Sequence, residues 1–462
     1  MNYLELFAGS ERKPVTAALA GVGEFGYTLL HRARRIAGFS VAALADRDTA
    51  RVVHALERLG YRDGQWRACG SAGSAADAMA RGLVAVCQDG TLLAELPCDI
   101  LVEATGDAEA GARHALAAIA ARKHVAMVTK ETDSVVGPVL ARRARDAGVI
   151  YTPVDGDQPA LLIGLVSWAR LLGLPIVAAG KASEYDFVFD AATETVIWQA
   201  RRLHVPGFGR LWDRKDGALP ALAAERAALL RELPRRIVAD YCELCVVANA
   251  TGLRPDIPEL HVPHARTPEL PQLYAPREHG GLIGRRGALD VFQCLRRPDE
   301  ASFAGGVFVC VALEDEGTAG LLAGKGIPVS ADRRYAVIYN PSHLLGVEAP
   351  VSILAAARLG RSVLDESLRP VCDVAAVASE ELPAGTRLEM VGNRHTLRGL
   401  EAHLVDAAPA APGAPVPYYM LTGARLAQTV AKGALVTRAA VSSPPDSVLW
   451  SLRAEQDASY RA

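Results

Sequence analysis

Lys130 and Lys181 are the residues of this chain whose type and position best suit chemistry on a carbonyl or hydroxyl group. Lys181 follows the apolar run 176–179 and Gly180, and Lys130 ends the run 124–130. A lysine ammonium can stabilise a developing alkoxide, and a lysine whose pKa is lowered can pass a proton to it. We therefore expect both lysines to line one cleft; a surface position is the alternative for each.

Three polar side chains in the middle of the chain are further catalytic candidates. Asn249, Asp256 and His343 lie in polar or proline-rich segments, where loops that contact a substrate are common. We expect these side chains to converge with the two lysines. A hydrogen-bonded structural role is the alternative, above all for His343.

Three acids could hold a divalent metal ion. Asp157, Glu184 and Glu243 offer the hard oxygen ligands that Mg²⁺ and Mn²⁺ prefer. Glu184 belongs to an acidic loop after Lys181, which suits a metal or a substrate without phosphate. For each acid, a helix-capping or surface role is the alternative.

A glycine-rich turn is the strongest signal for a cofactor. The apolar run 15–20 leads into Gly21-Val22-Gly23-Glu24-Phe25-Gly26, and a helical run 27–33 follows. In this G-x-G-x-x-G pattern the three glycines allow a tight turn, a close approach of pyrophosphate and close packing of the helix on the strand. The phosphates then lie at a helix N-terminus, which favours anions. An ordinary glycine turn between a strand and a helix is the alternative.

An acid at the expected distance supports a dinucleotide. Asp46 ends the apolar run 41–45, twenty residues after Gly26, where a carboxylate binds the ribose hydroxyls of NAD. Asp46 disfavours the 2′-phosphate of NADP, whereas Arg47 could hold it. The predicted cofactor-binding residues are Gly21, Gly23, Glu24, Phe25, Gly26, Asp46, Arg47, Thr105, Gly106 and Lys130.

Composition narrows the class of protein. The chain has 462 residues with a formal net charge of −2, which gives no electrostatic reason to expect nucleic acid or a membrane as partner. Apolar stretches are too short for a transmembrane helix, and no signal peptide is visible. Eight cysteines in so long a chain suit a reducing compartment, so we expect a cytoplasmic protein. Separately, we expect a homodimer or a higher homo-oligomer.

The pattern of apolar runs predicts an α/β protein of three domains. Residues 1–155 alternate strands and helices, as a Rossmann-type doubly wound sheet does. Residues 156–366 form an α+β catalytic domain. Residues 367–462 contain short strands with Pro-Gly turns and predict a small β domain. We expect this last domain to support assembly or to enclose the site, and not to bind the dinucleotide.

The motifs resemble those of a known group of enzymes over nearly the whole chain. The nucleotide-binding part resembles homoserine dehydrogenases in three segments: the glycine turn, the strand end at residues 102–106 and the run 124–130. Spaced motifs of the middle part resemble relatives of these enzymes that end in a SAF domain, a β-clip, and that include the type II (DXR-like) 1-deoxyxylulose-5-phosphate reductoisomerases. These middle motifs are Gly156-Asp157, Gly180-Lys181, Asn249–Gly252, Pro255-Asp256 and Pro341 with His343.

The resemblance implies an NAD(P)-dependent oxidoreductase acting on a small polar carbonyl or hydroxy compound. The reductoisomerase branch uses NADPH, so we slightly favour NADP. Homoserine dehydrogenase is the alternative within the same class. A nucleotide-sensing module without catalysis is the alternative from another class, and the presence of both Lys130 and Lys181 argues against it.

Overall fold

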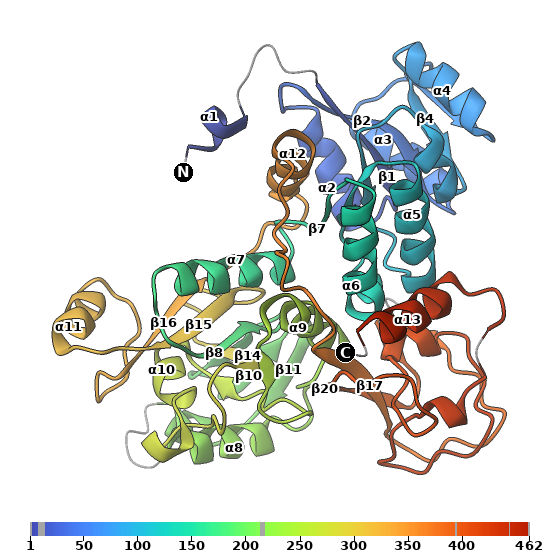
Figure 1. Cartoon of the computed structure of the whole chain (residues 1–462). Coiled ribbons are helices and arrows are strands. Elements are labelled where there is room, and N and C mark those ends of the chain that lie inside the picture. The colour runs from blue at the N-terminus through green and yellow to red at the C-terminus, as the bar shows by residue number, and fades with distance from the viewer. Residues whose placement is uncertain (1, 8–13, 213–217, 393–394, 443, 461–462) are drawn as a thin grey trace. The chain divides into compact units, whose positions relative to one another are not determined.

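The structure is a computed structural model that describes residues 2–7, 14–212, 218–392, 395–442 and 444–460 (Figure 1). Its chain groups into two compact units. Unit 1 contains residues 1–160, 344–401 and 407–462, and unit 2 contains residues 161–343 and 402–406. Among the described residues, no helix is both long and apolar enough to cross a membrane.

Unit 1 is built on a seven-stranded, all-parallel sheet with the order β3-β4-β2-β1-β5-β6-β7. The strands are β1 (Val15–Ala20), β2 (Phe39–Ala45), β3 (Trp66–Cys69), β4 (Val84–Cys87), β5 (Ile100–Glu103), β6 (His124–Met127) and β7 (Tyr151–Pro153). The chain leaves β1 for β2 and later returns to β5 on the other side of β1. This change of direction opens a crevice at the carboxyl ends of β1, β2 and β5.

Helices cover the sheet of unit 1. They are α1 (Tyr3–Phe7), α2 (Glu24–Ala33), α3 (Thr49–Arg58), α4 (Ala72–Ala80), α5 (Ala108–Ala120), α6 (Lys130–Asp146) and α12 (Ala349–Leu359). Alternate residues of β1, namely Val15, Ala17 and Leu19, form one buried cluster with α2, α3 and α12. This two-residue period places those three helices on one face of the sheet.

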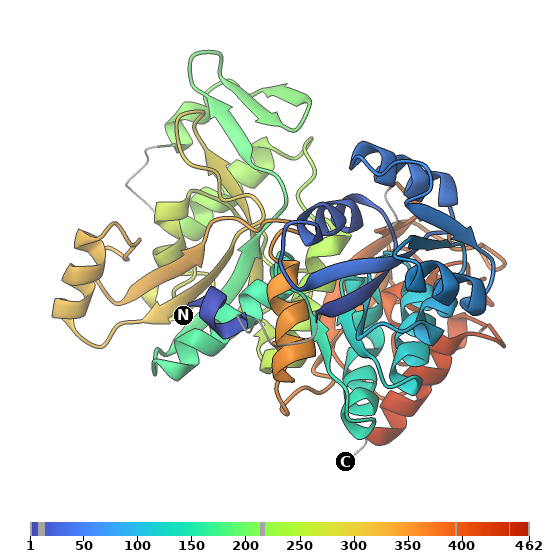
Figure 2. The same ribbon diagram turned by 90° about the horizontal axis from the view of Figure 1, so that it is seen from above.

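The C-terminal residues form small β elements that, apart from residues 402–406 of the last strand, belong to unit 1 together with the nucleotide part. They are β17 (Cys372–Ala378), β18 (Met390–Val391), β19 (Thr396–Leu397) and β20 (Leu400–Asp406), followed by helix α13 (Val448–Ser459). Gly385 and Gly433 lie in turns with positive φ, where glycine is expected between short strands. Figure 2 shows α13, in red, beside α5 and α6, against which it packs.

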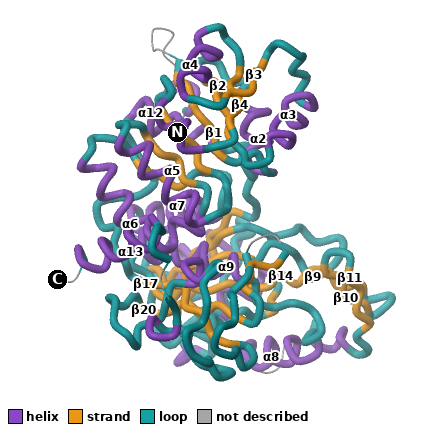
Figure 3. The backbone as a smooth tube through the Cα atoms, turned by 90° about the vertical axis from the view of Figure 1, so that its right-hand side faces the viewer, coloured by secondary structure: helices purple, strands orange, loops and turns teal. Residues whose placement is uncertain are grey.

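Unit 2 contains a nine-stranded mixed sheet whose main path is β11-β10-β9-β14-β8-β15-β16. Its strands are β8 (Ile176–Ala182), β9 (Phe187–Asp190), β10 (Thr195–Trp198), β11 (Arg201–His204), β12 (Arg254–Pro255), β13 (His264–Ala265), β14 (Ala288–Arg296), β15 (Val307–Ala312) and β16 (Tyr335–Asn340). Its helices are α7 (Gln158–Leu171), α8 (Leu219–Leu229), α9 (Val238–Thr251), α10 (Leu270–Leu273) and α11 (Glu316–Gly324). In Figure 3, β9, β10, β11 and β14 run together with α8 beside them.

These elements confirm the predicted fold class: a Rossmann-type parallel sheet, a mixed α+β part and small C-terminal β sheets. The division into three domains stays a prediction. Two local expectations need refinement. The segment 60–74, which looks irregular in sequence, contains β3, and Lys130 begins α6 rather than ending β6.

Candidate functional site

The glycine turn after β1 forms a narrow cradle. Gly21 has a φ of +92°, and a Cβ atom there would lie 2.3 Å from the carbonyl oxygen of Ala104. A Cβ on Gly26 would lie 2.3 Å from the oxygen of Gly21. Gly23, in contrast, borders open space at the start of α2. The first and third glycines therefore allow close packing, and the second leaves room for a phosphate at a helix N-terminus.

Asp46 lies beside this turn at the end of β2. Its Oδ2 accepts a hydrogen bond from the backbone N–H of Val22 at 3.0 Å, and its Oδ1 accepts one from the N–H of Asp48 at 3.0 Å. The guanidinium of Arg51 lies 4.0 Å from the same carboxylate. Asp46 thus ties the end of β2 to the glycine turn, and the neighbouring Arg47 is exposed.

A cavity of about 410 Å³ lies at this crevice of unit 1. Five of the predicted cofactor residues line it: Gly21, Gly23, Asp46, Arg47 and Thr105. The others do not lie on its lining: Glu24, Phe25, Gly26, Gly106 and Lys130. The cradle and the cavity fit a dinucleotide, because the open space at Gly23 and the acid at Asp46 match the two polar parts that it must place. That each residue binds the cofactor stays a prediction.

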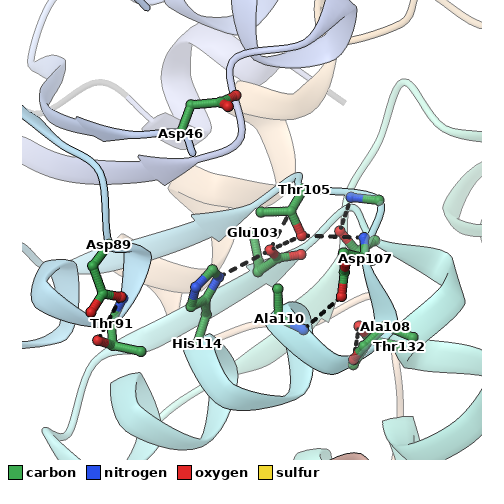
Figure 4. A network of polar contacts seen from close by, with 12 residues as sticks. Asp46, Asp89, Thr91, Glu103, Thr105, Asp107, Ala108, Ala110, His114 and Thr132 are labelled. Carbon is green, nitrogen blue, oxygen red and sulfur yellow. Dashed lines mark hydrogen bonds and ion pairs between the residues drawn. The ribbon is translucent and has the colours of Figure 1, made fainter. Parts of the chain in front are cut away.

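A buried acid–histidine pair at the end of β5 is the feature of this cavity that the motif does not reveal (Figure 4). Glu103 is fully buried, and its Oε1 accepts a hydrogen bond from Thr105 Oγ1 at 2.6 Å and lies 3.2 Å from His114 Nδ1. Within the described ranges, Glu103 Oε2 has no hydrogen-bond partner. His114 lines the cavity. The buried pair fixes the imidazole's orientation there.

Hydrogen bonds around α5 hold the other wall of the crevice. Thr105 Oγ1 accepts from the N–H of Asp107, and the Asp107 carboxylate caps α5 by accepting from the N–H of Ala110 at 3.0 Å (Figure 4). Gly106, with a φ of +66°, donates its N–H to Thr129 Oγ1. Side chains and backbone thus fix the loop that faces the glycine turn.

Lys130 and Asp157 form an ion pair within unit 1. Lys130 Nζ lies 3.1 Å from Asp157 Oδ1 and 3.4 Å from Oδ2. Gly156 precedes the acid with a φ of +80°, and a Cβ there would lie 2.7 Å from the oxygen of Leu344. The glycine therefore lets the turn pack against the segment before α12, and the turn presents Asp157 to the lysine.

Lys181 lies in a buried cluster of charges in unit 2. Its Nζ pairs with Asp240 at 2.7 Å and with Glu243, and Asp240 also accepts a hydrogen bond from Ser183 Oγ. Only 2% of the Lys181 side chain is exposed. Burial lowers the pKa of Lys181, but the charges of Asp240 and Glu243 outweigh burial and raise it. The ammonium therefore stays charged at neutral pH.

The two carboxylates reach Lys181 because they lie three residues apart on α9, on one face of the helix. Burial raises the pKa of Asp240, although the neighbouring ammonium lowers it. Asn249 lies further along α9, is also buried, and its amide contacts Cys245 Sγ at 3.7 Å. The sequence leaves residues 238–248 undecided between strand and helix, so it could not pair these acids with the lysine.

Asp256 belongs to a second cluster of unit 2 together with His261, which lies in the same proline-rich segment. His261 Nε2 lies 3.1 Å from Asp256 Oδ2, and Arg277 donates to the same oxygen at 2.9 Å. Leu260 and Val262, on either side of the histidine, have φ angles of +55° and +44°. Such angles are rare for a branched residue and mark a strained backbone.

Asp290 holds this strained segment in place. Its buried Oδ1 accepts hydrogen bonds from the N–H of His261 at 3.0 Å and of Val262 at 3.4 Å. Burial raises the pKa of Asp290. The strain and its carboxylate anchor could be found only from the backbone geometry, since Leu260-His261-Val262 carries no turn residue that signals a positive φ.

The remaining candidates are His343 and the metal ligands. His343 Nδ1 lies 2.9 Å from the carbonyl oxygen of Gly305 and is partly exposed. Within the described ranges no group of three His, Cys, Asp or Glu side chains is arranged to hold a metal ion. Asp157 and Glu243 each pair with a lysine, and Glu184 is exposed. These three acids therefore do not form a metal site by themselves, and a bound Mg²⁺ or Mn²⁺ stays a prediction.

A comparison with protein families matches residues 239–349 to the family described as "Oxidoreductase DRL, catalytic domain". This segment contains Asp240, Glu243, Asn249, Asp256 and His343. No curated protein matches the sequence. The catalytic-domain match and the dinucleotide cradle identify the chain as an NAD(P)-dependent oxidoreductase.

Solved structures that are similar to this chain include a probable dehydrogenase and a reductoisomerase. A probable dehydrogenase from Thermotoga maritima is 12% identical, with a TM-score of 0.36, over 75% of this chain and 90% of that chain. The 1-deoxy-D-xylulose 5-phosphate reductoisomerase from Zymomonas mobilis is 17% identical, with a TM-score of 0.31, over 51% of this chain and 58% of that chain.

An oxidoreductase from Agrobacterium radiobacter, in complex with NAD⁺, L-tartaric acid and magnesium, is 13% identical, with a TM-score of 0.30. That match covers 65% of this chain and 64% of the other chain. For the reductoisomerase and this oxidoreductase, the chain matches less than two thirds of their length.

Proposed function

We propose that this chain transfers a hydride between NADP and a small polar carbonyl or hydroxy compound, with the chemistry of the DXR-like reductoisomerases. The observation that carries the proposal is the cavity at the glycine turn, where Gly23 leaves space for phosphate and Arg47 lies beside Asp46. The match of residues 239–349 to an oxidoreductase catalytic domain supports it.

The chain's own residues would hold the cofactor as follows. Backbone N–H groups at the start of α2 bind the pyrophosphate. The Asp46 carboxylate faces the ribose hydroxyls, and the guanidinium of Arg47 offers a charge to a 2′-phosphate. A bound nicotinamide supplies the hydride. We expect the chain to bind NADPH more tightly than NADH. Arg47→Ser should reduce the ratio of the two dissociation constants about tenfold or more, because it removes one charge-assisted contact to the 2′-phosphate.

We assign to Lys181 the stabilisation of negative charge on the substrate oxygen. Asp240 and Glu243 keep its ammonium charged, so it acts through its charge and does not give up a proton. Its near-complete burial means that a substrate oxygen must take up one of the contacts that the carboxylates now make. Lys130, paired with Asp157, is the second candidate for this role.

A screen of NADPH and NADH oxidation tests the activity. Sugar phosphates, aldonate derivatives and aspartate semialdehyde should be tried with and without Mg²⁺. Turnover of a sugar phosphate supports the reductoisomerase-like reaction, and turnover of aspartate semialdehyde alone favours homoserine dehydrogenase. Calorimetry should accompany the screen. Binding of NADPH without turnover of any compound would favour a nucleotide-sensing module.

Lys181→Met tests the assigned role. Loss of one charged transition-state contact typically lowers turnover about 10²- to 10³-fold. Because the change leaves two buried carboxylates unpaired, the melting temperature of the variant must be measured beside its activity. Lys325→Met, at an exposed lysine of the same unit, is the matched control. Wild-type turnover in a folded Lys181→Met variant would show that the lysine has no such role.

A further inference from the structure

A second cavity of unit 1, of about 720 Å³, is not explained by the catalytic candidates. One side comes from the start of α5, at Gly106–Ala110 and Arg113. The other side comes from the C-terminal residues Met390, Met420 and Trp450. The cavity therefore lies between the nucleotide-binding sheet and the small β elements.

This second cavity adjoins the cavity at the glycine turn. Arg47, Asp107 and Ala110 line both. Arg47 follows Asp46 at the end of β2, and the other two residues lie at the start of α5. In a Rossmann-type sheet the acid after the second strand marks the ribose of the adenosine half. A dinucleotide whose ribose lies at Asp46 therefore has its adenine next to the second cavity.

The lining of the second cavity suits a flat aromatic ring. Met390, Met420 and Trp450 present polarisable and aromatic surface. Charges of both signs surround it, since Arg47 and Arg113 line the cavity together with Asp107, Glu109 and Asp446, and Arg113 pairs with Glu109 at 2.8 Å. Trp450 is held in place, because its Nε1 donates to the oxygen of Met420 at 3.2 Å and the Arg438 guanidinium lies 5.6 Å from its ring centre. Nucleic acid bases bind to such walls through stacking and dispersion.

The C-terminal wall is fixed to the nucleotide part by Glu109 of α5. The carboxylate of Glu109 accepts hydrogen bonds from Ser447 Oγ at 2.6 Å and from the N–H groups of Val448 at 2.9 Å and Leu449 at 3.1 Å. It thereby caps the first turn of α13, the helix that carries Trp450. Arg113, one helical turn after Glu109, donates to the oxygen of Asp446 at 2.6 Å. The cavity is thus preformed, which lowers the entropy cost of binding.

We infer that the C-terminal residues Met420 and Trp450 form one wall of the adenine pocket of the dinucleotide. The inference rests on the proposed cofactor function and deepens it. It replaces the expectation from the sequence that the C-terminal domain does not bind the dinucleotide. Adenine is the part of the cofactor that the cavity receives, and Arg47, shared by both cavities, lies on the side of the ribose.

Fragments of the cofactor test this assignment by calorimetry on the full chain. Adenosine 2′,5′-bisphosphate and AMP probe the adenine pocket, and nicotinamide mononucleotide probes the opposite half. Thr422 is exposed and lines the cavity, so Thr422→Trp fills the space without touching the buried core. Gln428→Trp adds the same side chain at an exposed position outside the lining and is the matched control.

Thr422→Trp should weaken binding of the adenosine fragments roughly 5- to 100-fold, because the new side chain occupies the space of the base and prevents its stacking against Met420 and Trp450. Affinity for nicotinamide mononucleotide should stay within about twofold, and Gln428→Trp should bind all fragments as the wild type does. If Thr422→Trp does not fold, Pro445→Trp narrows the same cavity from another exposed residue.

Equal affinity of wild type and variant for the adenosine fragments would overturn the inference and leave the cofactor proposal intact. An equal loss of affinity for the adenosine fragments and for nicotinamide mononucleotide, in a variant with an unchanged melting temperature, would also overturn the inference, since the effect would not be specific to adenine. A wild-type chain that binds neither NADPH nor any fragment would instead contradict the proposed function itself.

Discussion

Gly21 and Gly23 belong to one motif but meet different physical constraints. Gly21 has a left-handed φ and touches the backbone of Ala104, so a side chain there collides with atoms that cannot move away. Gly23 has an ordinary φ of −78° and open space around it. The fold needs the first glycine, whereas only a bound ligand needs the second.

Two substitutions should therefore separate folding from binding. Gly21→Ala should lower the free energy of unfolding by at least about 2 kcal/mol, because the strain of a left-handed φ adds to the steric overlap with the backbone of Ala104. Gly23→Val should change it by no more than about 0.5 kcal/mol and still weaken NADPH binding more than tenfold. Chemical denaturation and calorimetry measure the two effects. Unchanged affinity in Gly23→Val would mean that the pyrophosphate does not approach this residue.

Asp133 provides a test of pH dependence at a single buried group. Burial raises its pKa to about 7, although a hydrogen bond from Tyr151 Oη at 3.0 Å lowers it. Gly137 leaves the space for this carboxyl group, since a Cβ there would lie 2.1 Å from Asp133 Oδ1. A raised pKa in the folded state means that the group favours folding at low pH, and this contribution is lost as pH rises through about 7.

Asp133→Asn should remove this loss. Relative to the wild type, the variant's free energy of unfolding should rise by about 2–3 kcal/mol between pH 5 and pH 8, the amount that linkage gives for two pH units below a pKa near 7. Urea denaturation at both pH values measures it. Asp77→Asn, at an exposed aspartate of α4, is the control. A constant difference between variant and wild type would show that Asp133 is ionised throughout.

Sequence reasoning found the residues that a local motif defines and missed those that only tertiary packing brings together. Gly21, Gly23 and Asp46 could be placed because strand, turn and helix follow each other directly. Glu103 and His114 are eleven residues apart, and their pairing depends on how α5 lies over β5. The one signal in the sequence is the glutamate Glu103 at the end of an apolar strand. A carboxylate that becomes buried there needs a hydrogen-bonding partner.

At the scale of elements, the position of α13 depends on a cap supplied by another helix. Glu109 satisfies three donors at the start of α13, and Arg142 and Arg143 of α6 pair with Glu455 further along it. Arg453 of α13 is buried and bonds to Asp373 of β17 through two nitrogens, at 2.5 and 2.7 Å. Helix α13 therefore links the nucleotide sheet to the C-terminal β elements.

Glu109→Ala measures how much this cap contributes to the free energy of unfolding. Loss of a side-chain cap at a helix N-terminus costs about 0.5–2 kcal/mol, and removal of a charge that favours the helix dipole adds to it. We expect a decrease of about 1–2 kcal/mol in the free energy of unfolding. Glu57→Ala, at an exposed position of α3, serves as the control and should change little. An equal free energy of unfolding for Glu109→Ala and Glu57→Ala would mean that water satisfies the donors at the start of α13 as well as the carboxylate does.

Element prediction from the sequence succeeded where periodicity was clear and failed where it was not. The continuous apolar runs of residues 15–20 and 41–45, each followed by a turn residue, match β1 and most of β2. Helix α9 is buried on nearly all sides, so its apolar residues show no helical stripe. Without that assignment, Asp240 and Glu243 could not be placed on one face, so the ion pair of Glu243 with Lys181 was not predicted beside its expected role as a metal ligand.

At the scale of the molecule, the C-terminal residues other than 402–406 belong to one unit with the nucleotide-binding residues. From the sequence, a chain ending near residue 365 is expected to keep cofactor binding if it folds. Since α5 and α6 pack against α13, we now expect this truncated chain to be destabilised and to aggregate. Size-exclusion chromatography and thermal unfolding measure this. A monodisperse truncated chain with the wild-type melting temperature would contradict it.

The bond between Val139 and Gln456 joins positions 317 residues apart, and this separation bears on the order of folding. Contacts between such distant positions form late, because chain closure must come before they stabilise anything. The parallel sheet is made first during synthesis, yet the surfaces of α5 and α6 that receive α13 stay open to water until the last hundred residues have folded. Rapid docking of α13 is therefore what shortens the period in which a nascent chain can self-associate.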